Sequence, residues 1–264
     1  MKCSICKQEG HNKRTCKNEP IIDSISNKKK ENCVNVDKVK MVLHTEDTGK
    51  IFEMAICLAY DIKYDGKYKY SMEEPEKLKN RLYKLKELFP MCSHTAKKGA
   101  RYDYTSVSNK DYHLSAKSTK KGVGKVAPQV IGQSQPKKFC EIINIEYTTV
   151  PDLKKYIQIE IMKILPILIE YTFNCPNIYY NQEDNTIRFI KLLSHIEWDK
   201  YKYVWTNKWT EWNNSSTLKI IIQDKEISLL EFQFHTKNRT NMAIRWFYEN
   251  FLTIFKDNLS IIDI

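Results

Sequence analysis

The chain has 264 residues, 42% of them hydrophobic, which is enough for one large domain with its own core plus a small module. Its net charge of +11 suggests a polyanionic partner, most simply nucleic acid, although lysine-rich usage also accompanies an AT-rich genome. Of the eight cysteines, three lie in a metal-like cluster and the others are scattered, a pattern of reduced cysteines that excludes a disulfide scaffold. Charged residues within the longest apolar stretch, residues 157–173, exclude a membrane span. We expect a soluble intracellular protein, located in the cytoplasm or nucleus. The cell in question includes the case of a virus-infected host.

The first 17 residues hold a metal-binding pattern. Cys3, Cys6, His11 and Cys16 have the spacing of a CCHC zinc knuckle, in which three thiolates and one imidazole complete a tetrahedral Zn²⁺ shell. Such a short module has no core, so the metal supplies its folding free energy. Zinc knuckles contact single-stranded or structured nucleic acid, and the alternatives are a protein partner or chance clustering. The polar residues 18–43 follow as a flexible linker, so residues 44–264 make up the large domain.

A helix is predicted from about residue 48 to residue 59, and it is apolar on nearly all sides. Glu53 is the exception, because a carboxylate in a buried helix needs a partner or a metal. An ion pair with one of the many lysines is the alternative explanation. Residues 71–89 follow as an amphipathic surface helix, with leucines at helical spacing and basic residues on the other faces.

Residues 99–117 are interpreted as a strand–turn–strand unit. Asp103 ends the first segment, residues 106–111 form the turn, and residues 112–117 form an extended run. Alternation puts His113, Ser115 and Lys117 on one face of that run. Asp103 and Lys117 then meet at one spot. A carboxylate that holds Mg²⁺ beside an ammonium that steers or deprotonates a water suits phosphodiester cleavage. The alternative is a surface hairpin closed by a salt bridge.

This segment resembles the core of the PD-(D/E)XK nucleases, in particular type II restriction endonucleases. Asp103 matches the first acid and Lys117 the lysine, whereas Ser115 stands where the pattern has its second acid. The resemblance implies an α/β fold with a mixed sheet flanked by helices, catalytic Mg²⁺ and DNA as substrate. It also implies that a glutamate on the preceding helix joins the metal site, so Glu53 becomes the candidate for the missing carboxylate. The backbone carbonyl of Ala116 is a further implied ligand.

The loop after the catalytic run holds two glycines and three lysines, Lys120, Lys121 and Lys125, which suits contact with a phosphate backbone. A helix is predicted over residues 136–145. A long helix is predicted over residues 150–173, with a kink at Pro166. A strand follows near residues 186–192, and the aromatic residues between 196 and 214 suit either base stacking or a core, with the core favoured.

Residues 217–222 and 226–235 form a predicted hairpin, and a helix is expected over residues 240–256. The hairpin and the segment after it resemble C-terminal elements of some restriction enzymes. Gln233, His235 and Arg239 are therefore candidates for DNA contact, since glutamine reads adenine and arginine reads guanine or phosphate.

Other carboxylates are alternatives for the site. Asp224 followed by Glu231-x-Gln233 is a second variant of the nuclease pattern, ranked below Asp103 and Lys117 because its spacing is short and no lysine ends it. Glu141 and Glu231 are the next candidates for the missing carboxylate after Glu53.

Together these patterns predict a metal-dependent endonuclease of double-stranded DNA, of restriction type, with Zn²⁺ in the knuckle and Mg²⁺ at the catalytic site. A homodimer is a further expectation. One alternative is a non-catalytic nucleic-acid-binding protein that uses the knuckle, and Ser115 in place of an acid favours it. The other is an assembly protein whose knuckle binds a partner.

Overall fold

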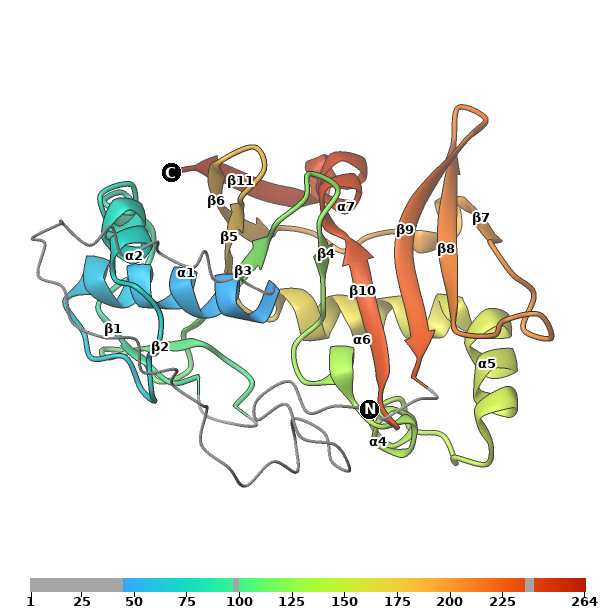
Figure 1. Cartoon of the computed structure of the whole chain (residues 1–264). Helices are drawn as coiled ribbons and strands as arrows, with labels where there is room; N and C mark the ends of the chain where they lie inside the picture. Colours follow the sequence, from blue (N-terminus) through green and yellow to red (C-terminus); the bar gives the residue numbers. More distant parts are fainter. Residues whose placement is uncertain (1–44, 97–99, 236–239) are drawn as a thin grey trace, which may run out of the picture. The chain divides into compact units, whose positions relative to one another are not determined.

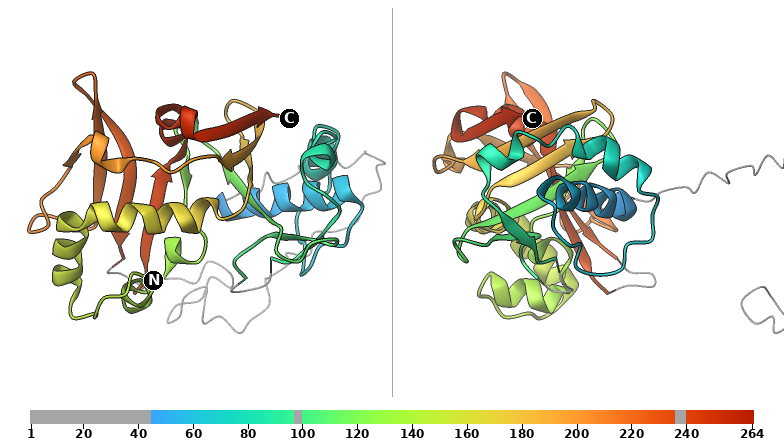
Figure 2. Two further views of the ribbon diagram at one scale, coloured as in Figure 1. Left: turned by 180° about the vertical axis from the view of Figure 1, so that it is seen from behind. Right: turned by 90° about the vertical axis from the view of Figure 1, so that its left-hand side faces the viewer.

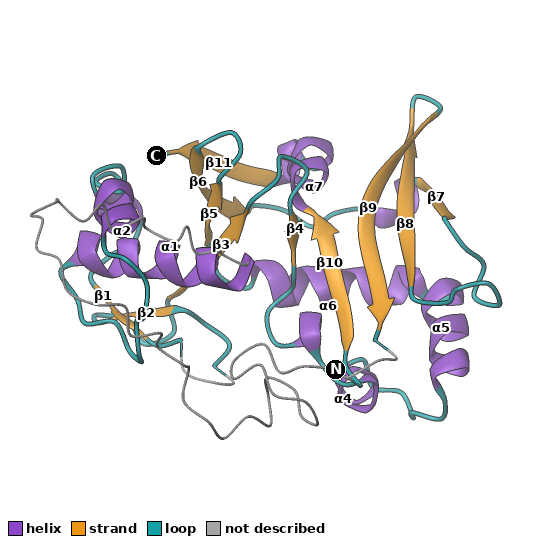
Figure 3. Cartoon of the chain, in the orientation of Figure 1, coloured by secondary structure: helices purple, strands orange, loops and turns teal. Residues whose placement is uncertain are grey.

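The computed structural model describes residues 45–96, 100–235 and 240–264, which form a mixed α/β structure with two sheets. Figure 1 shows the elements in chain order and Figure 3 separates helices from strands. The zinc-knuckle residues, the linker and Arg239 lie outside the described residues. None of the helices in the described ranges has the length and apolar character needed to cross a membrane.

A six-stranded mixed sheet lies at the centre of the fold. Its order is β1-β2-β3-β5-β6-β11, antiparallel throughout except that β3 and β5 run parallel. The strands are β1 (Cys92–His94), β2 (Tyr104–Ser106), β3 (His113–Thr119), β5 (Asn177–Asn181), β6 (Thr186–Leu192) and β11 (Leu259–Asp263). A parallel pair needs a long crossover. Here the crossover contains α4 (Pro136–Ile142), α5 (Val150–Ile159) and α6 (Ile161–Phe173).

Helices cover both faces of this sheet. On one face α1 (Thr45–Tyr60), α2 (Glu73–Lys79) and α3 (Leu85–Leu88) pack in one hydrophobic cluster. The other face packs against α6 and α7 (Tyr248–Ile254). Strand alternation explains the division, because Ile178 and Tyr180 of β5 join the α1 cluster while Tyr179 joins the α6 cluster. In the left view of Figure 2, α1 (blue) and α5 (yellow-green) lie at opposite ends of the row formed by the two sheets.

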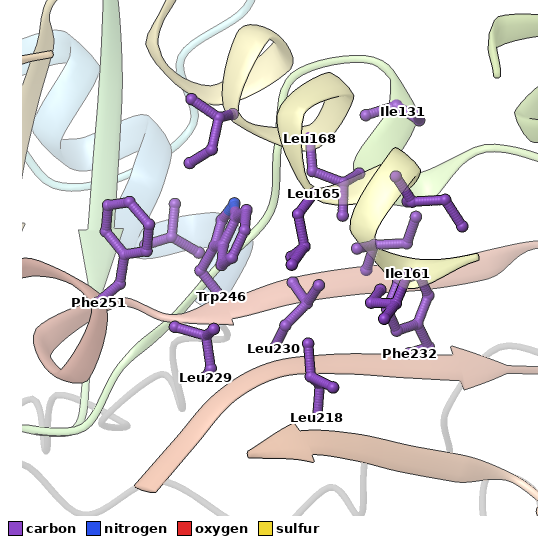
Figure 4. Packing of buried hydrophobic residues seen from close by; sticks show 14 of the residues in the cluster. Ile131, Ile161, Leu165, Leu168, Leu218, Leu229, Leu230, Phe232, Trp246 and Phe251 are labelled. Atoms are coloured by element: carbon purple, nitrogen blue, oxygen red, sulfur yellow. The ribbon is translucent and has the colours of Figure 1, made fainter. Parts of the chain in front are cut away.

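The second sheet is antiparallel, with the order β4-β10-β9-β8-β7. Its strands are β4 (Lys125–Val126), β7 (Lys202–Trp205), β8 (Ser215–Ile222), β9 (Lys225–Phe234) and β10 (Met242–Phe247). Figure 4 shows side chains of α6, among them Leu165 and Leu168, facing those of this sheet, among them Leu230. Trp246 is fully buried there and donates a hydrogen bond to Thr172 of α6 at 2.9 Å, so its polar atom is satisfied. Through α6 the two sheets share one core.

The C-terminal prediction is wrong in its first half. Met242–Phe247 is a strand paired on both sides, with β4 and β9, and the helix begins only at Tyr248. An apolar run interrupted by Arg245 suits a strand with neighbours on both sides, and these long-range pairings outweigh the helical spacing of the aromatic residues. The hairpin expected before it is confirmed as β8 and β9.

Two other predicted helices are each divided in two. The chain turns at Glu160, so α5 and α6 run in different directions (Figure 1), and Pro166 lies within α6 instead of marking a kink between two halves. The turn allows Ile157 of α5 and Ile164 of α6 to enter the same core. In the earlier segment, residues 80–84 separate α2 from α3. Of the tryptophans between 196 and 214, Trp198 and Trp212 are buried in the core, as favoured.

Candidate active site

Asp103 lies directly before β2 and is held by the neighbouring strand β3. The hydroxyl of Ser115 donates to Asp103 Oδ2 at 2.9 Å, and the backbone N–H of Ala116 donates to the same oxygen at 2.7 Å. Ser115 is itself fully buried, so its hydroxyl cannot turn to water. These two hydrogen bonds fix the orientation of the Asp103 carboxylate. Both of them end on Oδ2.

Lys117 and Glu53 lie close enough to Asp103 for their charges to affect it. Burial raises the pKa of the Asp103 carboxyl above its ordinary value, the Lys117 ammonium lowers this pKa, and the Glu53 carboxylate raises it. Lys117 is on β3, two residues after Ser115 and on the same side of the strand. The hydroxyl of Ser115 thus contacts Asp103, and Lys117 on β3 and Glu53 on α1 lie within electrostatic range of the same carboxyl.

Glu53 comes to the site from the partly exposed side of α1. Its side chain is 19% exposed, and Oε2 accepts a hydrogen bond from the Tyr64 hydroxyl at 3.3 Å. The Tyr104 hydroxyl donates to the backbone oxygen of Glu53 at 2.7 Å, which ties α1 to β2. Among the described residues the Glu53 carboxylate contacts the ring nitrogen Nε2 of His94, at 3.4 Å, and does not pair with a lysine as the alternative explanation required.

The donor atoms at this site suit a hard cation. Mg²⁺ uses oxygen ligands, commonly one or two carboxylates and several waters, and Asp103 and Glu53 supply two carboxylates. Within the described ranges no group of three or more histidine, cysteine or acidic side chains is placed to hold a metal. The fit to Mg²⁺ rests on the two carboxylates.

A groove of about 700 Å³ opens beside β3. Of the side chains that line it, one is acidic, Glu46, and five are basic: Lys117, Lys120, Lys121, Lys125 and Arg245. The three loop lysines predicted to contact phosphate thus lie in the same groove as Lys117. The turn between them is tight. Gly124 has φ +37°, and a Cβ there would lie 2.6 Å from Thr119 Oγ1, so glycine is needed.

The carboxylate of Glu231 on β9 forms ion pairs with two basic side chains. Its carboxylate lies 2.8 Å from Lys125 Nζ and 2.9 Å from Arg245 Nη2, and Arg245 also donates to Gln233. Seven residues of extended chain separate Asp224 from Glu231, which is about 23 Å. The second variant of the nuclease pattern is therefore wrong as a single metal site. Glu141 is half exposed on α4 and paired with Lys138 at 3.1 Å.

The proposed DNA-contact residues of the hairpin are separated in the structure. Gln233 is held beside the groove through Arg245, which lines it. His235 lies elsewhere, in a second pocket of about 450 Å³ between the end of β9 and the start of α4. The predicted strand 226–235 included both residues, but β9 ends at Phe234, so strand alternation does not extend to His235.

Sequence reasoning missed two residues of this region. Arg245 was assigned to a helix, and only its strand position on β10 directs it to the groove. His94 had no motif at all. Its contact with Glu53 brings the end of β1 to α1, and no local sequence pattern predicts this arrangement.

Comparison with known proteins gives one informative match. The chain is 42% identical over 239 residues to the type II restriction enzyme CviAII of Paramecium bursaria Chlorella virus 1, an alignment that covers 89% of this chain and 68% of the viral enzyme. No family model matches the chain, and no solved structure matches it.

Proposed function

The chain belongs to the family of type II restriction enzymes, and from this premise we propose that Asp103, Lys117 and Glu53 form a Mg²⁺-dependent site of the PD-(D/E)XK type. Its activity is that of an endonuclease, the hydrolysis of phosphodiester bonds in double-stranded DNA. Family membership favours the enzyme over the non-catalytic binding protein and the assembly protein. The observation that carries the site is the hydrogen-bonded Asp103 carboxylate beside Lys117 and Glu53.

Asp103 and Glu53 would hold the cation, with the backbone carbonyl of Ala116 as a further ligand. Bound there, Mg²⁺ supplies positive charge against the negative charge that builds on the phosphate. Lys117 orients or deprotonates the water that attacks in line with the leaving 3′ oxygen. Strand β3 pairs with β2 through His113 and Leu114 and with β5 at Lys117 itself, which supports the backbone that carries this lysine.

Ser115 stands where the nuclease pattern has its second acid, and its side chain still contacts Asp103. Its hydroxyl donates to Asp103, whereas a carboxylate there would repel Asp103 and could not donate while ionised. Glu53 then provides the second carboxylate from α1. The departure from the pattern is thus consistent with activity, provided that Glu53 is a ligand.

The groove is the proposed path of the DNA backbone. Lys120, Lys121 and Lys125 would contact phosphates there, which positions the duplex without reading its sequence. Gln233 and Arg245 are the candidates for base contact beside it. His235 and Arg239 stay predictions for DNA contact.

A cleavage assay tests the proposal. Supercoiled plasmid DNA should be cut in Mg²⁺ and left intact in EDTA. Asp103→Ala, Lys117→Ala and Glu53→Gln should each lower the rate by a factor of about 100 or more while gel-shift binding persists. Lys138→Ala, which removes a lysine on α4 that does not line the groove, is the matched control and should cut at the wild-type rate. Wild-type cleavage by Glu53→Gln would place the second carboxylate elsewhere.

The N-terminal module is proposed from sequence alone. Cys3, Cys6, His11 and Cys16 would bind one structural Zn²⁺ and contact nucleic acid, single strands included. Elemental analysis of purified protein should give one zinc per chain, and a protein from zinc-replete medium without zinc would exclude the knuckle. The homodimer and the intracellular location stay predictions.

A further inference from the structure

His94 is a buried histidine that the proposed mechanism leaves unused. It ends β1, and its side chain is 0% exposed. The backbone N–H of Asp65 donates to Nδ1 at 2.8 Å, so Nδ1 is an acceptor and carries no hydrogen. The ring hydrogen is therefore on Nε2, because a neutral imidazole has one donor and one acceptor nitrogen.

That Nε2 lies beside Glu53, the proposed metal ligand. It lies 3.4 Å from Glu53 Oε2 and has no hydrogen bond of ordinary geometry among the described residues. A buried donor normally has a partner, and the carboxylate it faces is Glu53. The Tyr64 ring stacks on the His94 ring at 4.5 Å, and the Tyr64 hydroxyl donates to the same Glu53 oxygen.

We propose that His94 is a positioning residue that orients Glu53 for the cation, an inference that rests on the proposed role of Glu53 as a ligand. Nε2 and the Tyr64 hydroxyl lie 3.4 and 3.3 Å from the same oxygen, Oε2, so together they would hold that oxygen and leave Oε1 to bind the cation. A carboxylate ligand held in this way binds metal without first losing rotational freedom. Outer groups that hold ligands typically contribute a factor of about 10–100 to metal affinity.

A purely structural role is the competing explanation, since His94 also packs against Tyr64 and Tyr104. Two substitutions of similar size and polarity separate the two roles. His94→Gln places an amide N–H near the position of Nε2 and can still donate to Glu53. His94→Asn places its amide near Nδ1, keeps an acceptor for the Asp65 N–H and does not reach Glu53.

The experiment measures Mn²⁺ binding to the full chain, already supplied with zinc, by the electron paramagnetic resonance signal of free Mn²⁺. We expect His94→Asn to raise the dissociation constant about tenfold or more and His94→Gln to stay within about threefold of wild type. At saturating Mg²⁺, cleavage by His94→Asn should approach the wild-type rate, so the defect appears as a higher metal requirement. The proposal is overturned if both variants weaken Mn²⁺ binding equally, or if His94→Asn does not weaken it.

Glu53→Gln separates failure of this inference from failure of the proposed function. If Glu53→Gln binds Mn²⁺ as tightly as wild type, Glu53 is not a ligand and the proposed site itself is wrong. If Glu53→Gln binds Mn²⁺ more weakly than wild type and His94→Asn does not, only the proposed role of His94 is wrong. Should His94→Asn fail to fold, the nitrogen chemical shifts of wild-type His94 decide, because a hydrogen on Nδ1 instead of Nε2 contradicts the proposal.

Discussion

Replacing Asp103 by asparagine should stabilise the metal-free protein while abolishing cleavage. Asparagine keeps the size of aspartate and an oxygen that accepts from Ser115 and Ala116, whose donors lie at 2.9 and 2.7 Å. Exchanging two charge-assisted bonds for neutral ones loses about 1 kcal/mol each, about 2 kcal/mol in all. Removing the buried charge recovers a desolvation penalty of several kcal/mol. Because burial is the largest influence on this carboxyl's pKa, we expect a net gain of about 1 kcal/mol.

The same change should alter how stability depends on pH. The pKa of Asp103 is raised above the ordinary 3.8 in the folded protein, so its protonated form favours folding. The stability that it contributes is fully present below the ordinary pKa and is lost as the pH rises through the folded pKa. The difference between Asp103→Asn and wild type should therefore be widest at pH 8 and narrow toward pH 4.

Thermal unfolding in EDTA, followed by circular dichroism from pH 8 to pH 4, measures this effect. A gain of about 1 kcal/mol raises Tm by about 2–4 °C in a domain of this size. Added Mg²⁺ should raise the Tm of wild type and not that of Asp103→Asn, because binding to the folded state stabilises it. A variant less stable than wild type at pH 8 would refute the argument that burial outweighs the hydrogen bonds and Lys117.

Three further changes test the surroundings of the site. Ser115→Ala should lower unfolding free energy in urea by about 1–2 kcal/mol and raise the Mg²⁺ concentration needed for cleavage, because Asp103 loses a donor; unchanged values would remove Ser115 from the site. Lys121→Ala should reduce the slope of log binding constant against log salt by about 0.9 in gel shifts, and an unchanged slope would mean no phosphate contact there. Gly124→Ala should destabilise by about 1–3 kcal/mol in urea, since its Cβ meets Thr119, and wild-type stability would show that the turn relaxes.

The fold could be predicted from the sequence where one element decides its own structure. Alternation located β3 and the β8–β9 hairpin, and a mixed α/β fold flanked by helices followed from the family resemblance. The prediction failed over Met242–Phe247, because this segment is a strand only through its partners. One partner, β4, lies more than a hundred residues earlier in the chain, and the other, β9, lies about ten residues earlier. Likewise, the break at Glu160 serves packing on both sides of it, which helical spacing alone does not reveal.

The candidate site shows the same limit. Asp103 and Lys117 were found because their spacing is local to one strand–turn–strand unit, and Glu53 because a carboxylate is conspicuous in an apolar helix. His94 and Arg245 are ordinary residues in sequence. Each acquires its place only when β1 meets α1 or when β10 joins the second sheet.

The parallel pairing of β3 with β5 also affects the synthesis of the protein. Lys117 is opposite Tyr179 in this pair, and the whole crossover of three helices lies between them in the chain. Such distant pairings form late, after the intervening chain exists. A nascent chain that stops before β5 therefore carries Asp103 and Lys117 but leaves the strand of Lys117 as an unpaired edge. We therefore expect fragments from interrupted translation to lack the support that β5 gives to the strand of Lys117.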